Sequence, residues 1–111
     1  MRWTPREQLA RLPGPATDRW PEGERFVRAF ARGAVSVELY APVGHDPQTP
    51  HDEDELYFIA TGTGVLSIDG VEHAFAPGDM FFVGAGVAHR FESFSEGFAA
   101  WAVFWPATGA G

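Results

Sequence analysis

Short apolar segments, separated by turn-forming residues about every 8–12 residues, fill the sequence from residue 25 to residue 106. Within residues 35–40, for example, valine and leucine alternate with polar residues and tyrosine, as in a strand with one buried face. Asp69 and Gly70 lie between two such segments and give a strong hairpin signal. No convincing helix pattern follows residue 24. The spacing therefore predicts about eight or nine strands in an all-β sandwich or barrel.

The first 24 residues differ in composition, since they are rich in proline and glycine. Thr4 as N-cap and Pro5 at the first helical position predict a short helix that ends by Leu12. The prolines that follow favour an irregular path. Trp3 and Trp20 indicate that this arm packs against a sheet, which could belong to the same chain or to a partner.

The length of 111 residues predicts a single domain with one core. We divide it into an N-terminal arm at residues 1–24, a barrel at residues 25–106 and a flexible tail at residues 107–111. Several strands carry apolar residues on both faces, so the outer face of the barrel also needs a cover. The arm or a second subunit would provide one, and we expect a homodimer.

Composition excludes several kinds of site and partner. The chain has no cysteine, which excludes disulfides, thiolate zinc sites and cysteine nucleophiles and leaves histidine and carboxylates as metal ligands. The net charge of −7 argues against nucleic acid as the main partner. No apolar run approaches the roughly 18–20 residues of a membrane helix, and the N-terminus lacks the apolar centre of a signal peptide. We therefore expect a cytoplasmic protein that does not bind membranes.

The strongest candidate site lies in residues 49–62. His51 and Glu55 stand four residues apart there, directly before an apolar segment. His89 follows a second stretch that contains two glycines, residues 84–88. Two imidazoles and a carboxylate, brought together by folding, predict a site for a divalent metal ion. The acidic residues between His51 and Glu55 could contribute to the attraction of a cation or form a solvated loop.

With these residues in place, the chain resembles the small single-domain cupins of the RmlC-like superfamily. Their first motif reads G-x5-H-x-H-x3-4-E-x6-G. His51 falls on its second histidine, Glu55 on its glutamate and Gly62 on its closing glycine, while Gly44 stands one residue away from the position of its opening glycine. The resemblance spans roughly residues 35–105 and implies a double-stranded β-helix, or jelly-roll barrel.

The second cupin motif reads G-x5-P-x-G-x2-H-x3-N, and the chain matches it at Gly78, Gly86 and His89. Two positions depart from it, because Gly84 replaces the proline and Ser93 replaces the asparagine. These are turn and support positions, and their loss need not harm metal binding.

The departure in the first motif is more serious, because Thr49 occupies the position of its first histidine. A hydroxyl is a poorer ligand than imidazole for a divalent transition metal. The resemblance thus implies a three-residue metal site of His51, Glu55 and His89 that holds zinc, iron, manganese or nickel.

A metal site of this kind implies a dioxygenase- or isomerase-like cupin that binds or acts on a small oxygen-bearing molecule. Glu55 would serve as catalytic base if it is not purely a ligand. The alternative is a non-catalytic cupin that binds a small ligand and has a degenerate metal site. Six residues are predicted to line the cavity: Thr49, Tyr57, Met80, Phe82, Phe91 and Trp101.

Four further polar residues have weaker claims to the site. His45 lies in a proline-rich loop and could swing in to replace the missing ligand, or remain solvated. Gln48 could offer an amide oxygen if the loop bends. His73 is expected on the surface of a strand, and Arg90 is expected to face outward because it has the opposite parity to His89.

Overall fold

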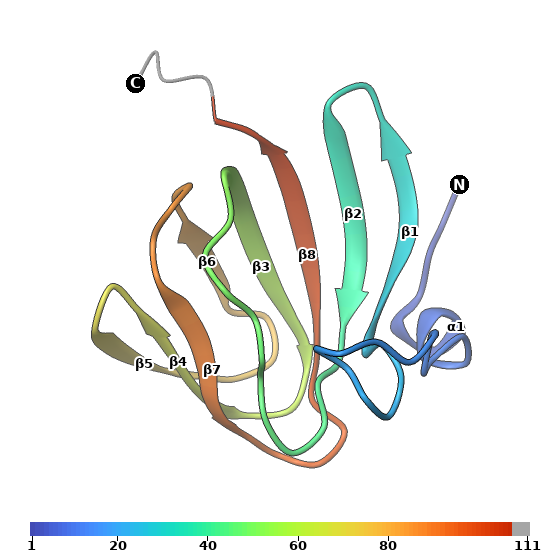
Figure 1. Cartoon of the computed structure of the whole chain (residues 1–111), viewed down its shortest axis with the longest axis horizontal. Coiled ribbons are helices and arrows are strands. Elements are labelled where there is room, and N and C mark those ends of the chain that lie inside the picture. The colour runs from blue at the N-terminus through green and yellow to red at the C-terminus, as the bar shows by residue number, and fades with distance from the viewer. Residues whose placement is uncertain (108–111) are drawn as a thin grey trace.

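The computed structural model describes residues 1–107 and folds mainly into antiparallel β-strands (Figure 1). Its elements are α1 (Pro5–Leu9), β1 (Phe26–Arg32), β2 (Val35–Tyr40), β3 (Glu53–Thr61), β4 (Gly64–Ile68), β5 (Val71–Phe75), β6 (Met80–Val83), β7 (His89–Phe94) and β8 (Ala99–Pro106). A five-stranded sheet has the order β1-β2-β8-β3-β6, and a three-stranded sheet has the order β5-β4-β7. The all-β jelly-roll prediction is confirmed, although the strands form two separate sheets without closing into one continuous barrel.

The two sheets share one core. Tyr57 and Ile59 contribute to it from β3, while Leu66 and Phe91 contribute from β4 and β7. Alternation in β3 buries Glu55, Tyr57 and Ile59 on the inner face, as the period of two of a strand requires. Glu55 therefore enters the interior through the same alternation that builds the core.

Alanines on β8 leave room beside the inner face of β3. Register pairs Tyr57 with Ala102 and Ile59 with Ala100, and both alanines are fully buried. Since directly paired residues share a face of the sheet, these small side chains lie next to large ones on the inner surface. A barrel of this size is filled by its own side chains unless some of them are small.

The N-terminal arm packs against its own barrel. Thr4 caps α1 by accepting a hydrogen bond from the Glu7 amide, and Pro5 takes the first helical position as predicted. Trp20 is buried and meets Tyr40 edge to face, with ring centroids 6.0 Å apart. Trp3 stacks on Phe30 at 4.3 Å. The alternative that the arm needs a partner's sheet for its tryptophans is thereby removed.

One turn and one close contact show why glycine is required at particular positions. Asp69 and Gly70 both have positive φ, at 50° and 79°, which matches the tight hairpin predicted between β4 and β5. Gly64 lies so close to β7 that an added Cβ would stand 2.1 Å from the Ser93 carbonyl oxygen. The approach of β4 to β7 at this point depends on the missing side chain.

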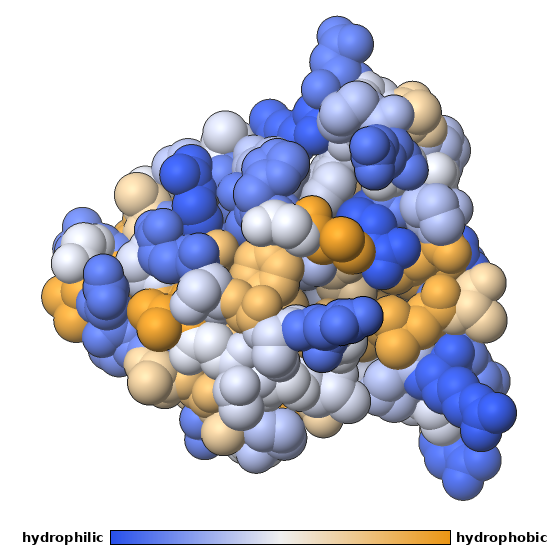
Figure 2. Space-filling model, turned by 90° about the horizontal axis from the view of Figure 1, so that it is seen from below, coloured by the Kyte–Doolittle hydropathy of each residue, from blue (hydrophilic) through white to orange (hydrophobic). Residues whose placement is uncertain are grey.

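The outer face of β3 and β6 carries exposed hydrophobic residues. Phe58, Met80 and Phe82 are 39%, 57% and 57% exposed, and register pairs Phe58 with Met80. Seen from below, by contrast, the molecule shows separate hydrophobic patches divided by hydrophilic residues (Figure 2). Across residues 1–107 no helix is long and apolar enough to cross a membrane.

Candidate metal centre

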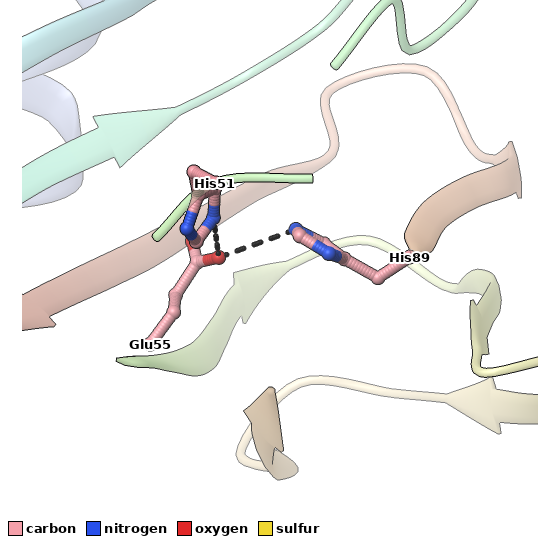
Figure 3. Close-up of side chains that lie close together, drawn as sticks. All are labelled: His51, Glu55 and His89. Carbon is pink, nitrogen blue, oxygen red and sulfur yellow. Dashed lines mark hydrogen bonds and ion pairs between the residues drawn. The ribbon is translucent and has the colours of Figure 1, made fainter. Parts of the chain in front are cut away.

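Three side chains converge inside the barrel from different parts of the chain (Figure 3). His51 lies in the loop before β3, Glu55 lies in β3, and His89 is the first residue of β7. The Oε1 atom of Glu55 lies 3.0 Å from Nε2 of His51 and 3.3 Å from Nε2 of His89. One ligand atom from each residue fits within a span of 4.8 Å. The structure thus brings together the three predicted metal ligands.

His51 reaches this centre from the loop. It does not share a strand with Glu55, because β3 begins only at Glu53. The Gly86 amide donates a hydrogen bond of 2.7 Å to the His51 carbonyl and ties this loop to the turn before β7. Gly86 has φ of 77°, a conformation that glycine adopts at little cost. The glycine of the second motif thus helps to position the histidine of the first.

Backbone carbonyls determine which ring nitrogen of each histidine carries hydrogen. Nδ1 of His51 lies 3.1 Å from the Glu53 carbonyl oxygen, and Nδ1 of His89 lies 2.8 Å from the Val87 carbonyl oxygen. Because a carbonyl can only accept, each Nδ1 donates, and in the neutral ring the Nε2 lone pair is then free. Metal-binding histidines are commonly oriented in this way by a second partner.

The donor set fits a metal ion. Two Nε2 lone pairs and a carboxylate oxygen point at one another, which is repulsive unless a cation lies between them. Nε2 of His89 is buried and has no hydrogen-bond partner among residues 1–107, although Oε1 of Glu55 lies 3.3 Å away. Two imidazoles and one carboxylate match the ligands of zinc and of non-haem iron.

A proton is the alternative cation for this cluster. Burial lowers the pKa of His89, but the Glu55 carboxylate and the Val87 carbonyl outweigh it and raise that pKa above its ordinary value. A protonated His89 would pair with Glu55 without a metal. Metal and proton therefore compete for the same atom.

A cavity of about 190 Å³ lies beside the centre. Its walls are formed by His51 and Glu55, by Thr49 and Tyr57 as predicted, and by residues from the arm, β1, β2, the loop before β3, and β8: Arg19, Trp20, Phe26, Glu38, Tyr40, Gln48, Pro50 and Phe104. Aromatic rings supply much of this surface. The cavity would hold roughly six water molecules at about 30 Å³ each, which suits a small ligand.

Four residues that were predicted to line the cavity lie elsewhere. Met80 and Phe82 are exposed because β6 pairs with β3 so that Phe81 and Val83 share the inner face with Tyr57 and Glu55. The alternation assigned to β6 from the sequence was therefore wrong by one residue. Phe91 is buried in the shared core, and Trp101 packs on the other side of β8 near Leu39.

A sequence profile of the cupin domain matches residues 36–105. The chain belongs to the cupin family. An uncharacterized protein of Streptomyces coelicolor is 39% identical over 74 residues, which cover 65% of this chain and 70% of that protein. The family assignment agrees with the motif resemblance and with the observed fold.

Solved cupin structures show the same fold. A cupin 2 conserved barrel domain protein from Salinispora arenicola has a TM-score of 0.67 and 20% identity, covering 96% of this chain and 88% of its own. A protein of Ralstonia eutropha provisionally named a mannose-6-phosphate isomerase has a TM-score of 0.62 and 22% identity, covering 85% and 92%. At such identities the similarity concerns the fold.

The cupin site of this chain includes a hydrogen-bond network that the sequence analysis missed. Asp46 is buried and accepts hydrogen bonds from the Tyr40 hydroxyl, the Gln48 amide at 3.1 Å and the Phe91 amide at 2.9 Å. The Gln48 side-chain oxygen in turn accepts from the Tyr57 hydroxyl at 3.0 Å. Asp46 followed by Pro47 is a turn signal that could have revealed this bond to the residue two positions on.

The network keeps two phenols neutral beside the centre. Burial raises the pKa of Tyr57 well above its usual range, and Glu55 adds to the effect. Burial, with Asp46 second, also raises the pKa of Tyr40. Both hydroxyls therefore act as hydrogen-bond donors at neutral pH. Gln48 does face the interior, but its oxygen is occupied by Tyr57 and is not free for a metal.

Four other polar residues are exposed. His45 is exposed and lines a separate cavity between the arm and the loop after β2. His73 is exposed on β5, and Arg90 is exposed on β7, both as expected. Thr49, at the position of the missing cupin histidine, is an exposed residue at the rim of the cavity.

Proposed function

We propose that this cupin binds a divalent metal ion through His51, Glu55 and His89 and uses it to hold a small oxygen-bearing ligand in the adjoining cavity. The observation that carries the proposal is the orientation of the two histidines. Their Nδ1 atoms face backbone carbonyls, so their Nε2 atoms meet at the Glu55 carboxylate. Within the described residues, Nε2 of His89 has no hydrogen-bond partner. Purely structural histidines have no need of this arrangement, because it leaves a buried acceptor unsatisfied.

The chemistry suits an isomerase- or dioxygenase-like reaction. A bound divalent metal would polarise a ligand oxygen as a Lewis acid. The chain supplies the remaining conditions: Trp20, Phe26 and Phe104 exclude water from one side of the cavity. The Tyr57 hydroxyl is held by Gln48 and gives the wall a fixed polar group. Similarity to a protein provisionally named an isomerase supports the same class of reaction.

The metal content of the purified protein tests the proposal. We expect close to one equivalent of zinc, iron, manganese or nickel by elemental analysis of protein purified without a histidine tag. Protein stripped with a chelator should take up one equivalent again. Less than about a tenth of an equivalent, with no uptake on addition, would overturn the proposal and favour the non-catalytic alternative with a degenerate site.

A further inference from the structure

Glu38 is an acidic residue in the cavity that the metal centre does not use. It lies on β2, where register pairs it with Ala102, and Ala102 pairs in turn with Tyr57 on β3. The three residues form one row across the inner face of the sheet, with the smallest in the middle. The Glu38 side chain lines the cavity from the five-stranded sheet, whereas β7 and His89 belong to the three-stranded sheet.

Register places Arg28 opposite Glu38 on β1, but the Glu38 carboxyl has no partner at hydrogen-bond or ion-pair distance in the part of the chain that the structure describes. Within residues 1–107 it makes no hydrogen bond or ion pair, whereas Asp46 and Glu55 each have partners at hydrogen-bond distance. A carboxyl that is half-buried without a partner costs folding free energy, since its charged form loses hydration. Such a group is explained if a ligand supplies the missing partner.

The charges around Glu38 favour its neutral form. Burial is the main cause that raises its pKa, from 4.5 to about 7, and Glu55, Glu53 and Glu24 add to it while Arg28 opposes it. Exposed Arg19 also lines the cavity. A carboxyl that titrates near neutral pH is suited to accept and return protons.

We propose that Glu38 exchanges a proton with the ligand held in this cavity. The proposal rests on the proposed function, because the metal centre is what would hold the ligand. The ligand is then a neutral, weakly acidic oxygen compound, such as a hydroxamic acid or a compound with a hydroxyl group next to a carbonyl. Dianions fit poorly, because Glu38 and Glu55 already place two carboxyls in the cavity wall.

The proton transfer is balanced within the site. The O–H bond of the ligand breaks, and its electron pair remains on the ligand oxygen. The proton moves to a carboxylate oxygen of Glu38, which becomes a carboxylic acid. Negative charge thus passes from Glu38 to the ligand oxygen, and the proton returns when the ligand leaves. No other reactant is needed.

Acetohydroxamate is a suitable probe, because it is a neutral weak acid that chelates divalent metals as its anion through two oxygens. We suggest calorimetric titration of the zinc-loaded full-length protein, in buffers of different ionisation enthalpy, to count the protons released on binding. At about pH 8 the wild type should release close to none, because Glu38 takes up the proton. At a lower pH, where Glu38 of the zinc-loaded protein is protonated before the probe binds, it should release close to one.

The Glu38→Gln variant should release about one proton at both pH values, since it has no carboxyl to accept it. Glu72→Gln removes an exposed carboxylate from β5 and should behave as the wild type. Equal proton release by wild type and Glu38→Gln at about pH 8 would overturn the role of Glu38. So would retention of zinc with no binding of the probe. Failure to retain zinc is a separate result that would overturn the proposed function itself.

Discussion

Nε2 of His89 and Oε1 of Glu55 lie 3.3 Å apart inside the barrel, yet they form no hydrogen bond. His89 donates its Nδ1 hydrogen to the Val87 carbonyl, so its other nitrogen presents a lone pair to a carboxylate. Two hydrogen-bond acceptors at this distance repel each other unless a cation lies between them. Each of the first two predictions below depends on the identity of that cation.

Replacing His89 should abolish metal binding without unfolding the protein. His89→Ala removes one of three donor atoms, so we expect a greater loss of zinc affinity than the roughly 10–100-fold typical of changes behind the ligands. His73→Ala removes an exposed histidine from β5 and serves as the matched control. Elemental analysis and competition with a zinc chelator measure the effect. Equal zinc affinity in both variants would contradict the assigned ligands.

Zinc should stabilise the protein more at about pH 8 than at about pH 5.5. The pKa of His89 is raised in the folded protein, so the pairing of protonated His89 with Glu55 stabilises the metal-free fold. This stabilisation is complete below the pKa of the unfolded chain and is lost as pH rises through the pKa of the folded protein. Zinc binding needs the neutral ring, so its contribution grows over the same range. Thermal melts with and without zinc test this. Free zinc at 100 times Kd should add about 2.7 kcal/mol at the higher pH.

The sequence predicted the parts of the fold and site that depend on local signals. The hairpin at Asp69 and Gly70 follows from the φ that its turn requires, and the N-cap at Thr4 follows from its hydroxyl. The ligands His51, Glu55 and His89 were found because their spacing follows a family motif. These features depend on few neighbours, so a linear pattern is enough to reveal them.

Features that depend on strand pairing were harder to predict. Met80 and Phe82 were placed inside, and only the register of β6 against β3 shows that they face out. Glu38 looked like the polar half of an alternating strand, but it shares a face of β2 with buried Tyr40 and pairs with Ala102 on the inner face. A shift of one residue reverses every side chain of a strand. A short apolar run such as that of β6 contains no signal that determines the register of the strand.

Glu38→Gln should stabilise the protein at about pH 8 and not at about pH 4.5. Because the folded pKa of Glu38 is raised to about 7, the folded state binds more protons than the unfolded chain between pH 4.5 and that value. Stability contributed by the neutral carboxyl is therefore lost as pH rises through this window. The size of the pKa shift limits the gain in unfolding free energy to about 3 kcal/mol, and partial exposure of Glu38 to solvent reduces it further. Urea denaturation at both pH values, with Glu72→Gln as control, measures the difference.

Gly64→Ala should destabilise the protein by about 3 kcal/mol or more, because the new Cβ would stand 2.1 Å from the Ser93 carbonyl oxygen. Gly84→Ala provides the control. At Gly84 the nearest atom to an added Cβ is Val87 Cγ2 at 3.6 Å, which is an ordinary contact. That variant should be unchanged or up to about 1 kcal/mol more stable. Comparable denaturation midpoints for the two variants would contradict the close approach of β4 and β7.

The exposed outer face of β6 leads us to expect a homodimer. β6 is an edge strand of the five-stranded sheet, and Met80 and Phe82 point outward from it with more than half of their surface exposed. An apolar edge of this kind favours pairing with a second copy. Light scattering at micromolar concentration should give a dimer for the wild type and a monomer for Phe82→Glu. Val71→Glu changes an equally exposed residue on the other sheet and should remain dimeric. A monomeric wild type would contradict the expected homodimer.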